Sequence, residues 1–487
     1  TINVNFGQKP FKYAPTQGHL PLNSASATPE TVITRPGQYV GVTTYTGNQT
    51  ARVLSTKFAP DLVWTKRRDD SNSHQLYDSV RGDNKSLSSD STNAEVTTAN
   101  SASFASSNGI NIGSGTRSNE NSVSYVGWTW DAGSSNTSIA VGGLNSSAYD
   151  QSQTWSNSLT RYTVSGGSSA GSATDAFSGT IWSMSNAANS GYASDNIGSS
   201  ITFAPTSGTL VGRVVKLYQR DRPSTVTVNG TAATITTSGN TRICTVDLGS
   251  SQNITSVVTT ATTDGQTNAF SYIEVDGKLL VDSGVSVTNV PTIASTVRAN
   301  PSAGFSIVSY TGSGSAATIG HNLNTVPSLV IVKNRDAANY WQVFHVSVGN
   351  TKSLHLNATS APDTASSYWN DTSPTTSVFS VGSSVSVNNS GSNIIAYCFA
   401  PVEGYSAFGK FSGNSNTDGP FQYCGFKPRW ILCKKINNTD ANSGWHIYDS
   451  ARNQYNTLNN FLLAGKPYYE NRAANNTADV HTYTFDF

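Results

Sequence analysis

The sequence predicts an all-β chain of tandem β-sandwich or jelly-roll-like modules joined by short linkers, and three observations support this fold class. One short pattern occurs three times. Strand-like segments recur roughly every eight to twelve residues with turn signals between them. Charged residues make up only 12% of the chain, which disfavours long exposed helices because these need Glu, Lys and Arg on their outer face. The 21 Tyr, 18 Phe and 9 Trp supply enough apolar surface for cores.

Each copy of the repeat contains an aromatic-hydroxyl-glycine tripeptide, a strand that runs from a proline to a lysine, and a third element that opens with an aromatic residue. The step from proline to lysine is six residues in every copy, and the step from lysine to aromatic is 11, 11 and 14 residues. The copies are Tyr45-Thr-Gly47, Pro60 to Lys66 and Tyr77 to Arg81; Tyr310-Thr-Gly312, Pro327 to Lys333 and Phe344; and Phe411-Ser-Gly413, Pro428 to Lys434 and Tyr448 to Arg452. Repetition of one β-rich module is typical of a scaffold or a binding surface.

The repeat and the composition between its copies divide the chain into five segments. Alternating Ile2, Val4 and Phe6 predict a strand, and the prolines that follow predict a linker. An Asp276-Gly277 turn between two short strands predicts a hairpin of a separate small β-sandwich. The segments are 1–36, the end of a preceding domain plus a linker; 37–133, module one; 134–300, the distinct sandwich; 301–404, module two; and 405–487, module three, which we expect to be incomplete. These ends favour a fragment of a longer protein.

Charge and motif content exclude several classes of function. The net charge is +1 without a basic block, so we expect no nucleic-acid partner. No stretch approaches the roughly 18 apolar residues of a membrane span, so we expect no membrane insertion. The four cysteines (Cys244, Cys398, Cys424 and Cys433) and the seven histidines show no metal-ligand spacing. We therefore expect neither a metal nor a cofactor.

Carboxylates offer a glycosidase interpretation, which needs two carboxyl groups roughly 5 to 9 Å apart across a sugar cleft. The candidates in module one are Asp61, Asp69, Asp70, Glu95, Glu120 and Asp131. Adjacent residues on a strand point to opposite faces, so Asp69 and Asp70 would not form such a pair. We expect no enzyme and no catalytic residue.

A second candidate site combines an aromatic residue, an aspartate and an arginine three residues later. It occurs in modules one and three, as Tyr77, Asp78 and Arg81 and as Tyr448, Asp449 and Arg452. Carboxylate and guanidinium beside an aromatic ring could bind the vicinal hydroxyls of a saccharide. Alternatively, the aspartate caps a turn and pairs with the arginine. Both interpretations remain open from the sequence.

The recurring lysines at the strand ends, Lys66, Lys333 and Lys434, predict a solvent-facing guard against edge-to-edge pairing. The tryptophans of the modules recur at strand positions, as Trp64 and Trp430 do, so we expect them to pack in cores.

The repeated module resembles a domain of tail-fibre-like virion proteins from marine tailed bacteriophages, especially cyanophages. The Tyr-Thr-Gly opening, the Pro-x-Leu-Val-x-Val-Lys strand and the joint Tyr397–Gly409 carry this resemblance. The segments Asn416–Phe421 and Gly425–Pro428 are similar to the opening of that family's third copy. Residues 3–13 look like the last strand of a SPRY-type lectin-like sandwich. The resemblance covers most of the chain and supplies no catalytic residue.

This resemblance implies a virion structural protein on the exterior of the particle, a tail- or capsid-fibre component with a host-attachment, glycan-binding surface. The expected partners are copies of the chain in a homotrimer, other virion proteins and a host surface glycan. We expect the loops 83–121 and 357–391 to contact the host or neighbouring subunits. The alternatives are a polysaccharide depolymerase spike and a passive capsid decoration or tube protein without a receptor.

Overall fold

The structure is a computed structural model, and most of what it describes is antiparallel β-sheet. It describes residues 32–139, 141, 149–150, 154–155, 177, 191–193, 200–220, 224–238, 241–263, 268–281, 290–414, 416, 419–437, 444–452 and 460–470. The predicted SPRY-like strand and the end of module three lie outside these residues. None of the described helices is long and apolar enough to span a bilayer. The all-β fold class with sandwich modules is confirmed.

Module one contains a four-stranded antiparallel sheet in the order β1-β9-β3-β4. A smaller sheet, β2-β8-β7, packs on one face of it through Val63, Tyr77 and Ile110, which makes the module a sandwich. The elements are η1 (Pro36–Gln38), β1 (Val40–Thr46), β2 (Arg52–Ser55), β3 (Leu62–Arg67), β4 (Gln75–Asp78), β5 (Lys85–Ser86), β6 (Val96–Thr97), β7 (Ala102–Ser103), β8 (Gly109–Ile112), α2 (Thr116–Asn119) and β9 (Ser124–Trp130).

Module two repeats this topology inside a larger sheet. Its strands β25-β32-β27-β28 have the same order and antiparallel pairing as β1-β9-β3-β4. The pair β26-β31 corresponds to β2-β8. The elements are η3 (Pro301–Ala303), β25 (Phe305–Thr311), β26 (Ala317–Gly320), β27 (Leu329–Asn334), β28 (Gln342–His345), β29 (Lys352–His355), β30 (Asp363–Thr364), α3 (Ser366–Trp369), β31 (Val378–Val381), α4 (Val385–Asn388) and β32 (Asn393–Phe399).

The glycine of the Tyr-Thr-Gly tripeptide is required by a close approach of the backbone in both modules. A Cβ on Gly47 would lie 2.0 Å from the carbonyl oxygen of Glu120, and a Cβ on Gly312 would lie 2.2 Å from that of Asn389. Only glycine avoids such a clash with a backbone atom. The tyrosine of the tripeptide donates from its hydroxyl to the short helix nearby, from Tyr45 to Ser118 O and from Tyr310 to Val387 O. The tripeptide therefore forms the same local structure in modules one and two.

Module three contributes the strands β33 (Trp430–Lys434), β34 (Trp445–Asp449) and β35 (Leu462–Leu463). They pair in the order β33-β34-β35, as β27-β28-β29 do in module two. The register is also shared, because Ile447 pairs with Leu462 as Val343 pairs with Leu354. The described part of module three thus corresponds to the middle of the other two modules.

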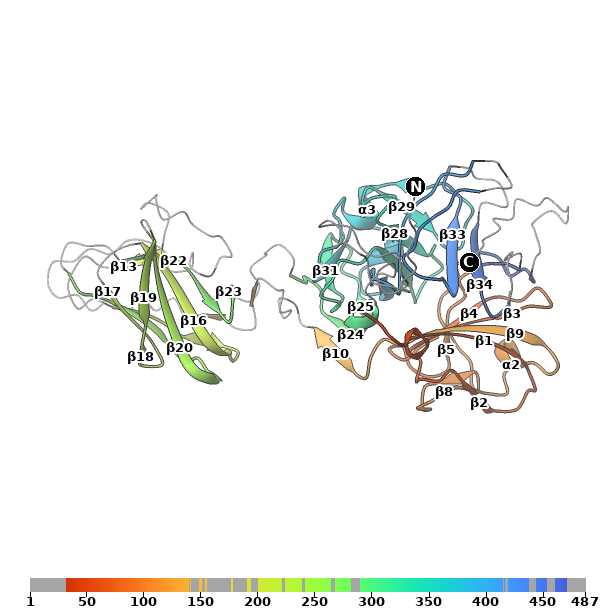
Figure 1. The fold of residues 1–487 in the computed structure, drawn as a ribbon, viewed down its shortest axis with the longest axis horizontal. Helices are drawn as coiled ribbons and strands as arrows, with labels where there is room; N and C mark the ends of the chain where they lie inside the picture. Colours follow the sequence, from red (N-terminus) through yellow and green to blue (C-terminus); the bar gives the residue numbers. More distant parts are fainter. Residues whose placement is uncertain are drawn as a thin grey trace, which may run out of the picture.

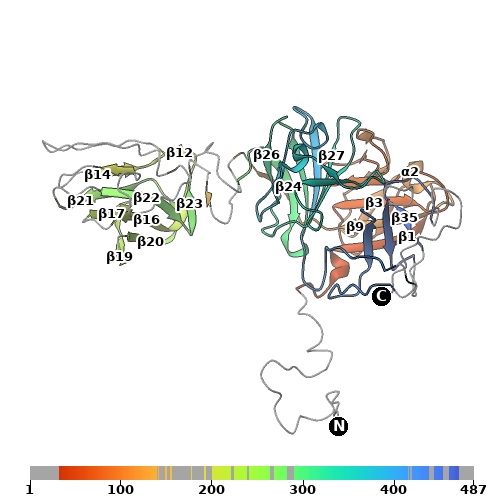
Figure 2. The same ribbon diagram turned by 90° about the horizontal axis from the view of Figure 1, so that it is seen from above.

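The segment between modules one and two is an inserted sandwich of two sheets, β11-β23-β22-β16-β20-β19 with β13 at β22, and β14-β21-β17-β18. Figures 1 and 2 draw it as a separate body beside the modules. Its elements are β11 (Tyr149–Asp150), β12 (Thr154–Trp155), β13 (Gly191–Ala193), β14 (Ser200–Phe203), β15 (Pro205–Ser207), β16 (Val211–Arg220), β17 (Ser224–Val228), β18 (Thr231–Ala232), β19 (Thr234–Ser238), β20 (Thr241–Asn253), β21 (Val257–Ala261), β22 (Asn268–Val275) and β23 (Lys278–Leu280).

Two strands within residues 134–300 belong to the sheet of module two rather than to the insert. These are β10 (Asn136–Ile139) and β24 (Ser295–Asn300), which pair antiparallel, and β24 in turn pairs with β25. The chain therefore enters and leaves the insert along two adjacent strands.

The strands β27 and β32 of module two are apolar on both faces, and the two faces enter different cores. Leu329 and Ile331 of β27 face a core shared by all three modules, whereas Val330 and Val332 face the core of module two alone. Successive side chains of a strand point to opposite faces, so a continuous apolar run indicates burial on both sides. The same alternation occurs in β33, where Trp430 and Leu432 face the shared core.

The modules close into a ring around this shared core, because equivalent ring nitrogens form hydrogen bonds to the next module. Trp341 Nε1 donates to Ser88 O at 3.0 Å, Trp445 Nε1 donates to His355 O at 2.9 Å, and His74 Nε2 lies 3.0 Å from Leu463 O. These contacts run from module two to one, from three to two and from one to three. In Figure 1 the orange, green-to-cyan and blue parts accordingly lie around a common centre. The modules are thus an integrated ring with one central core.

Candidate functional site

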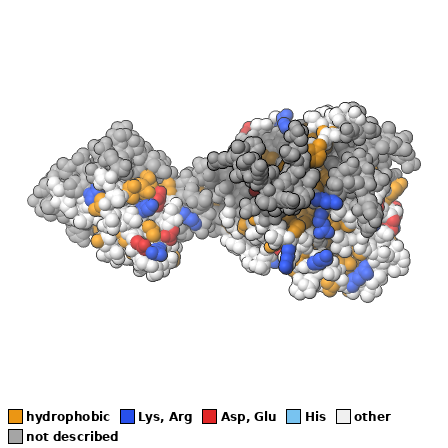
Figure 3. Space-filling model, viewed as in Figure 1, with side chains coloured by type: hydrophobic (Ala, Val, Ile, Leu, Met, Phe, Trp, Pro, Cys, Tyr) orange, Lys and Arg blue, Asp and Glu red, His pale blue; other side chains and the backbone are white. Residues whose placement is uncertain are grey.

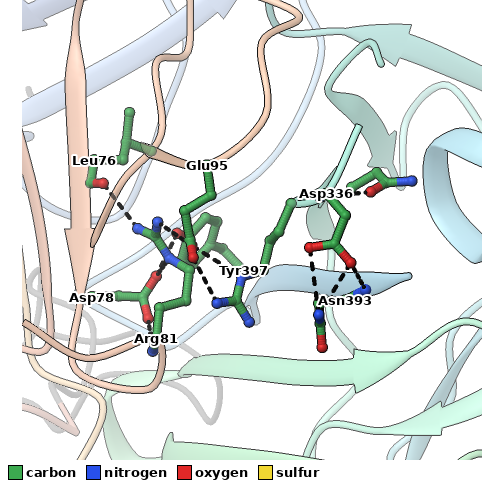
Figure 4. A network of polar contacts seen from close by, with 9 residues as sticks. Leu76, Asp78, Arg81, Glu95, Asp336, Asn393 and Tyr397 are labelled. Carbon is green, nitrogen blue, oxygen red and sulfur yellow. Dashed lines mark hydrogen bonds and ion pairs between the residues drawn. The ribbon is translucent and has the colours of Figure 1, made fainter. Parts of the chain in front are cut away.

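Two of the predicted site residues of module one, Asp78 and Arg81, lie at the joint between modules one and two. Arg81 pairs with Asp78 through Nε and with Glu95 through Nη1 at 3.1 Å. Glu95 also binds Arg335 of module two at 2.8 Å, and the Tyr397 hydroxyl of module two donates to Asp78 Oδ2 at 2.7 Å. Figure 4 shows this chain of charges, which crosses from β4 to β32.

Two of the predicted site residues of module three, Asp449 and Arg452, form an equivalent chain at the joint between modules three and one. Arg452 binds Asp449 at 2.6 Å and Glu470 at 3.1 Å. Glu470 binds Arg68 of module one at 2.8 Å, and Trp128 Nε1 donates to Asp449 Oδ2 at 2.9 Å. Trp128 therefore takes the place of Tyr397. The two joints share one series of contacts. An aromatic side chain of the next module donates to an aspartate, the aspartate binds an arginine, the arginine binds a glutamate, and the glutamate binds an arginine of the next module.

The joint between modules two and three has different side chains. His345 stands where the aspartates stand, and Val348 replaces the arginine. Among the described residues, this joint is held by the Trp445 bond to His355 O and by Lys434 Nζ, which donates to Ala358 O at 3.1 Å. The chain of charges is therefore a property of two joints, and the third is closed by neutral acceptors.

Burial and pairing shift the pKa values of the groups at the joints. Burial alone would raise the pKa of Glu95, but hydrogen bonds and charges from Arg335 and Arg81 outweigh it and hold this pKa below its ordinary value. Burial lowers the pKa of His74 well below 6.5, so the ring is neutral where it meets Leu463 O. The joints thus combine ionised pairs with a neutral histidine.

All six predicted ligand-binding residues are buried. The side chains of Asp78, Arg81, Asp449 and Arg452 are 0% exposed, and Tyr77 and Tyr448 lie inside the cores of their modules. Each aspartate also caps its own turn, because Arg81 N donates to Asp78 Oδ1 at 2.8 Å and Arg452 N to Asp449 Oδ1 at 2.9 Å. The turn-capping interpretation describes this arrangement, and a saccharide would find no exposed surface on these six side chains.

The prediction of a solvent-facing role for the recurring lysines is wrong for Lys66 and Lys333, whereas Lys434 is half-buried on β33, an outer strand of the described sheet of module three. Lys66 and Lys333 are 1% and 0% exposed, and their strands lie inside sheets rather than at an edge. Lys333 Nζ donates to the carbonyl oxygens of Asn334, Ala337 and Thr92, the last of which belongs to module one. Burial lowers the pKa of Lys333 to about 8. Lys333 therefore ties loops of modules one and two together at the end of its strand.

The carboxylates of the glycosidase interpretation have structural partners. Asp61 binds Arg298 of β24 at 2.6 Å and accepts from Ala132 N at 2.8 Å, which joins module one to the strand leaving the insert. Burial raises the pKa of Asp61 to about 6 against the opposing charge of Arg298. Asp69 and Glu120 both bind Arg67. In the described part of the chain no three His, Cys, Asp or Glu residues are grouped to hold a metal ion.

Sequence reasoning missed the partners that complete the joints, namely Glu95, Glu470, Arg68 and Arg335. A signal was available for the arginines, because each stands two residues after a recurring lysine (Lys66 and Lys333). The glutamates follow their arginines at different distances, so spacing alone does not reveal them. The prediction that the tryptophans pack in cores is confirmed for Trp128, Trp341 and Trp369, which are at most 2% exposed.

Charged side chains are a minority of the described side chains on the face that Figure 3 draws. Figure 3 shows mostly uncharged side chains, with scattered basic and acidic ones, on the face in view. The predicted contact loops are partly ordered elements: 83–121 includes β5 to β8 and α2, and 357–391 includes β30, α3, β31 and α4.

Comparison with known proteins gives one result. A family model described as a domain of unknown function, DUF7483, matches residues 35–208 and 213–487, which include the three modules and the insert. No curated protein and no solved structure matches the chain.

Proposed function

The chain belongs to the DUF7483 family, and we propose that it is a bacteriophage virion structural protein, a tail- or capsid-fibre component that carries a host-attachment surface. One observation carries this proposal: three copies of one module close around a single core, and their charged joint residues are turned inward. Such a ring is a rigid support. The resemblance of its modules to tail-fibre-like virion proteins supplies the biological context.

The architecture supports a mechanical and adhesive role. The insert is attached through the adjacent strands β10 and β24, and the pair Arg298 and Asp61 connects that attachment to module one. Weak contacts to a host glycan would add up when several copies are displayed together. We propose that the protein acts as a homotrimer with other virion proteins on the particle exterior. No observation among the described residues favours a depolymerase or a passive decoration protein.

The test is to locate the protein on purified particles of a phage that carries this sequence. Immunogold labelling with an antibody raised against the ring is expected to label a fibre or its tip, and native mass spectrometry of the purified chain is expected to give a trimer. Absence of the protein from the particles would contradict the proposal. Labelling confined to the shell or tube, without access for host cells, would favour the passive decoration protein.

A further inference from the structure

Module two carries a cluster of five polar and aromatic side chains beside its joint with module three. Tyr340 stacks on His355 with ring centroids 4.8 Å apart, and Tyr368 meets the same histidine edge-on at 6.4 Å. His355 Nδ1 lies 3.1 Å from Ser360 Oγ. The Tyr368 hydroxyl donates to Asp363 Oδ2 at 2.7 Å. The side chains come from β29, β30, α3 and the loops beside them, and they surround one histidine.

The cluster combines the exposed ring of Tyr340 with the buried ring of His355, and the hydrogen-bonding capacity of the histidine is only partly used. Tyr340 is 49% exposed, whereas His355 is 8% exposed. Among the residues that the structure describes, the Nε2 atom of His355 is buried and has no hydrogen-bond partner. A buried polar atom without a partner costs about 1–3 kcal/mol, so its presence calls for a reason other than stability.

The internal repeat shows that the fold does not require this cluster. Tyr340 precedes Trp341, and the residues that precede the equivalent His74 and Trp445 are Ser73 and Gly444. His355 lies opposite the residue after Trp341 in the β-ladder, and Leu463 holds the same place in module three. Modules one and three therefore form the same strands without a tyrosine and histidine pair. The cluster is a local addition to module two.

The chemistry of the cluster suits a polyhydroxylated ligand. An exposed tyrosine ring offers an apolar face for the C–H face of a sugar ring, and a carboxylate accepts hydrogen bonds from vicinal hydroxyl groups. Asp363 is exposed beside Tyr368 and is positioned to accept such bonds. Burial has the largest effect on the pKa of His355 and lowers it, whereas the nearby carboxylate of Asp363 raises it and the nearby Lys434 lowers it. Because the cluster lies near one negative and one positive side chain, a neutral ligand suits it better than a strongly charged one.

We propose that Tyr340, Tyr368 and Asp363 form a binding site for a neutral glycan chain at the joint between modules two and three. The inference deepens the proposed function, on which it rests, because it assigns host-surface glycan recognition to one place. Tyr340 stacks on the sugar, Asp363 accepts from its hydroxyl groups, and His355 with Ser360 holds the Tyr340 ring in position. The site lies partly in the predicted contact loop 357–391.

The experiment is affinity electrophoresis of the full chain in native gels cast with mannan, galactan or β-glucan, followed by titration with oligosaccharides of the polymer that retards it. The wild type is expected to be retarded by at least one polymer. Tyr340→Ala and Asp363→Asn are each expected to weaken binding about tenfold, or about 1.4 kcal/mol. Tyr340→Phe is expected to bind like the wild type, because the ring face is retained.

Matched controls separate this site from general effects. Tyr423→Ala removes another exposed tyrosine, and Asp371→Asn neutralises another exposed aspartate. Both are expected to bind like the wild type. Retardation that survives Tyr340→Ala would overturn the site and leave an attachment role elsewhere on the chain. No retardation by any of the three polymers would overturn the neutral glycan class, whereas the proposed virion role is tested separately by particle labelling.

Discussion

The joint between modules one and two and the joint between modules three and one are built alike, whereas the joint between modules two and three is different. The first two contain a buried aspartate and arginine pair that continues through a glutamate to an arginine of the next module. At the third joint the aspartate position is occupied by His345 and the arginine position by Val348. The three joints thus share one backbone arrangement, but two of them contain buried ion pairs and the third has hydrogen bonds to carbonyl oxygens.

This difference shows which features the ring needs and which it can vary. A ring nitrogen meets a carbonyl oxygen at all three joints, so this contact belongs to the common geometry. A buried ion pair is costly to desolvate and becomes a liability when one partner is lost. The joint between modules two and three has His345 and Val348 in place of the buried aspartate and arginine, so it does not carry this cost. Tyr340 and His355 lie beside this joint.

The largest expected effect is the loss of a buried charge from an ionic joint. Asp78→Ala leaves Arg81 buried without its closest partner and is expected to lower the free energy of unfolding by about 3–5 kcal/mol. Asp449→Ala is expected to cost a similar amount. Urea denaturation of both variants and of the exposed control Asp371→Asn measures the effect. A cost for Asp78→Ala no greater than that of the control would show that the ionic joints do not hold the ring.

A smaller effect is expected from the aromatic donor at the same joint. Tyr397→Phe removes the hydroxyl that donates to Asp78 Oδ2 and changes the side-chain volume little. Hydrogen bonds to charged groups contribute about 1.5–3 kcal/mol, and the free energy of unfolding is expected to fall by that amount. Tyr340→Phe, at the other kind of joint, should leave stability unchanged. Equal losses from the two variants would remove the distinction between the joints.

Acid is expected to weaken the joint between modules three and one before the joint between modules one and two. His74 occupies the position of Trp341 and Trp445, and burial holds its pKa below the value of about 6.5 in an unfolded chain. The contribution of the neutral ring is complete above pH 6.5 and falls by about 1.4 kcal/mol per pH unit below it. Hydrogen exchange, corrected for intrinsic rates, should show faster opening of residues 461–464 at pH 5. Unchanged protection of these residues would contradict the role of the neutral His74 ring at this joint.

The smallest effect is expected at the surface of the insert. Arg213 and Asp247 form a well-aligned pair with Nε to Oδ1 at 2.8 Å, but both side chains are about half exposed. Water and salt screen such a pair, so Arg213→Ala should leave the thermal unfolding midpoint unchanged. A marked fall in the midpoint would mean that exposure does not decide the strength of ion pairs in this protein.

The local structure of this chain could be predicted because its causes are local. The proline-to-lysine and aromatic elements form equivalent strands in all three modules, and the Asp276-Gly277 turn joins β22 to β23 as expected. The Tyr-Thr-Gly tripeptide forms the same structure in modules one and two, whereas Phe411-Ser-Gly413 lies outside the strands and a Cβ on Gly413 would meet open space. The sequence located the candidate site but did not decide whether its side chains bind a ligand or a neighbouring module. Asp78 and Arg81 are three residues apart, so their pairing was visible, whereas the Tyr397 hydroxyl comes from 319 residues away.

The sequence by itself determined the fold class, the repeat and the strands, because alternation, turn residues and propensity act over a few neighbours. The tertiary structure decided that the modules share one core, that Lys66 and Lys333 are buried, and that Asp78 and Asp449 face a neighbouring module. Burial and ion pairing depend on which distant segments meet, and ring closure brings together residues that no local pattern connects. That closure placed four of the six candidate ligand residues, Asp78, Arg81, Asp449 and Arg452, in the joints of the ring.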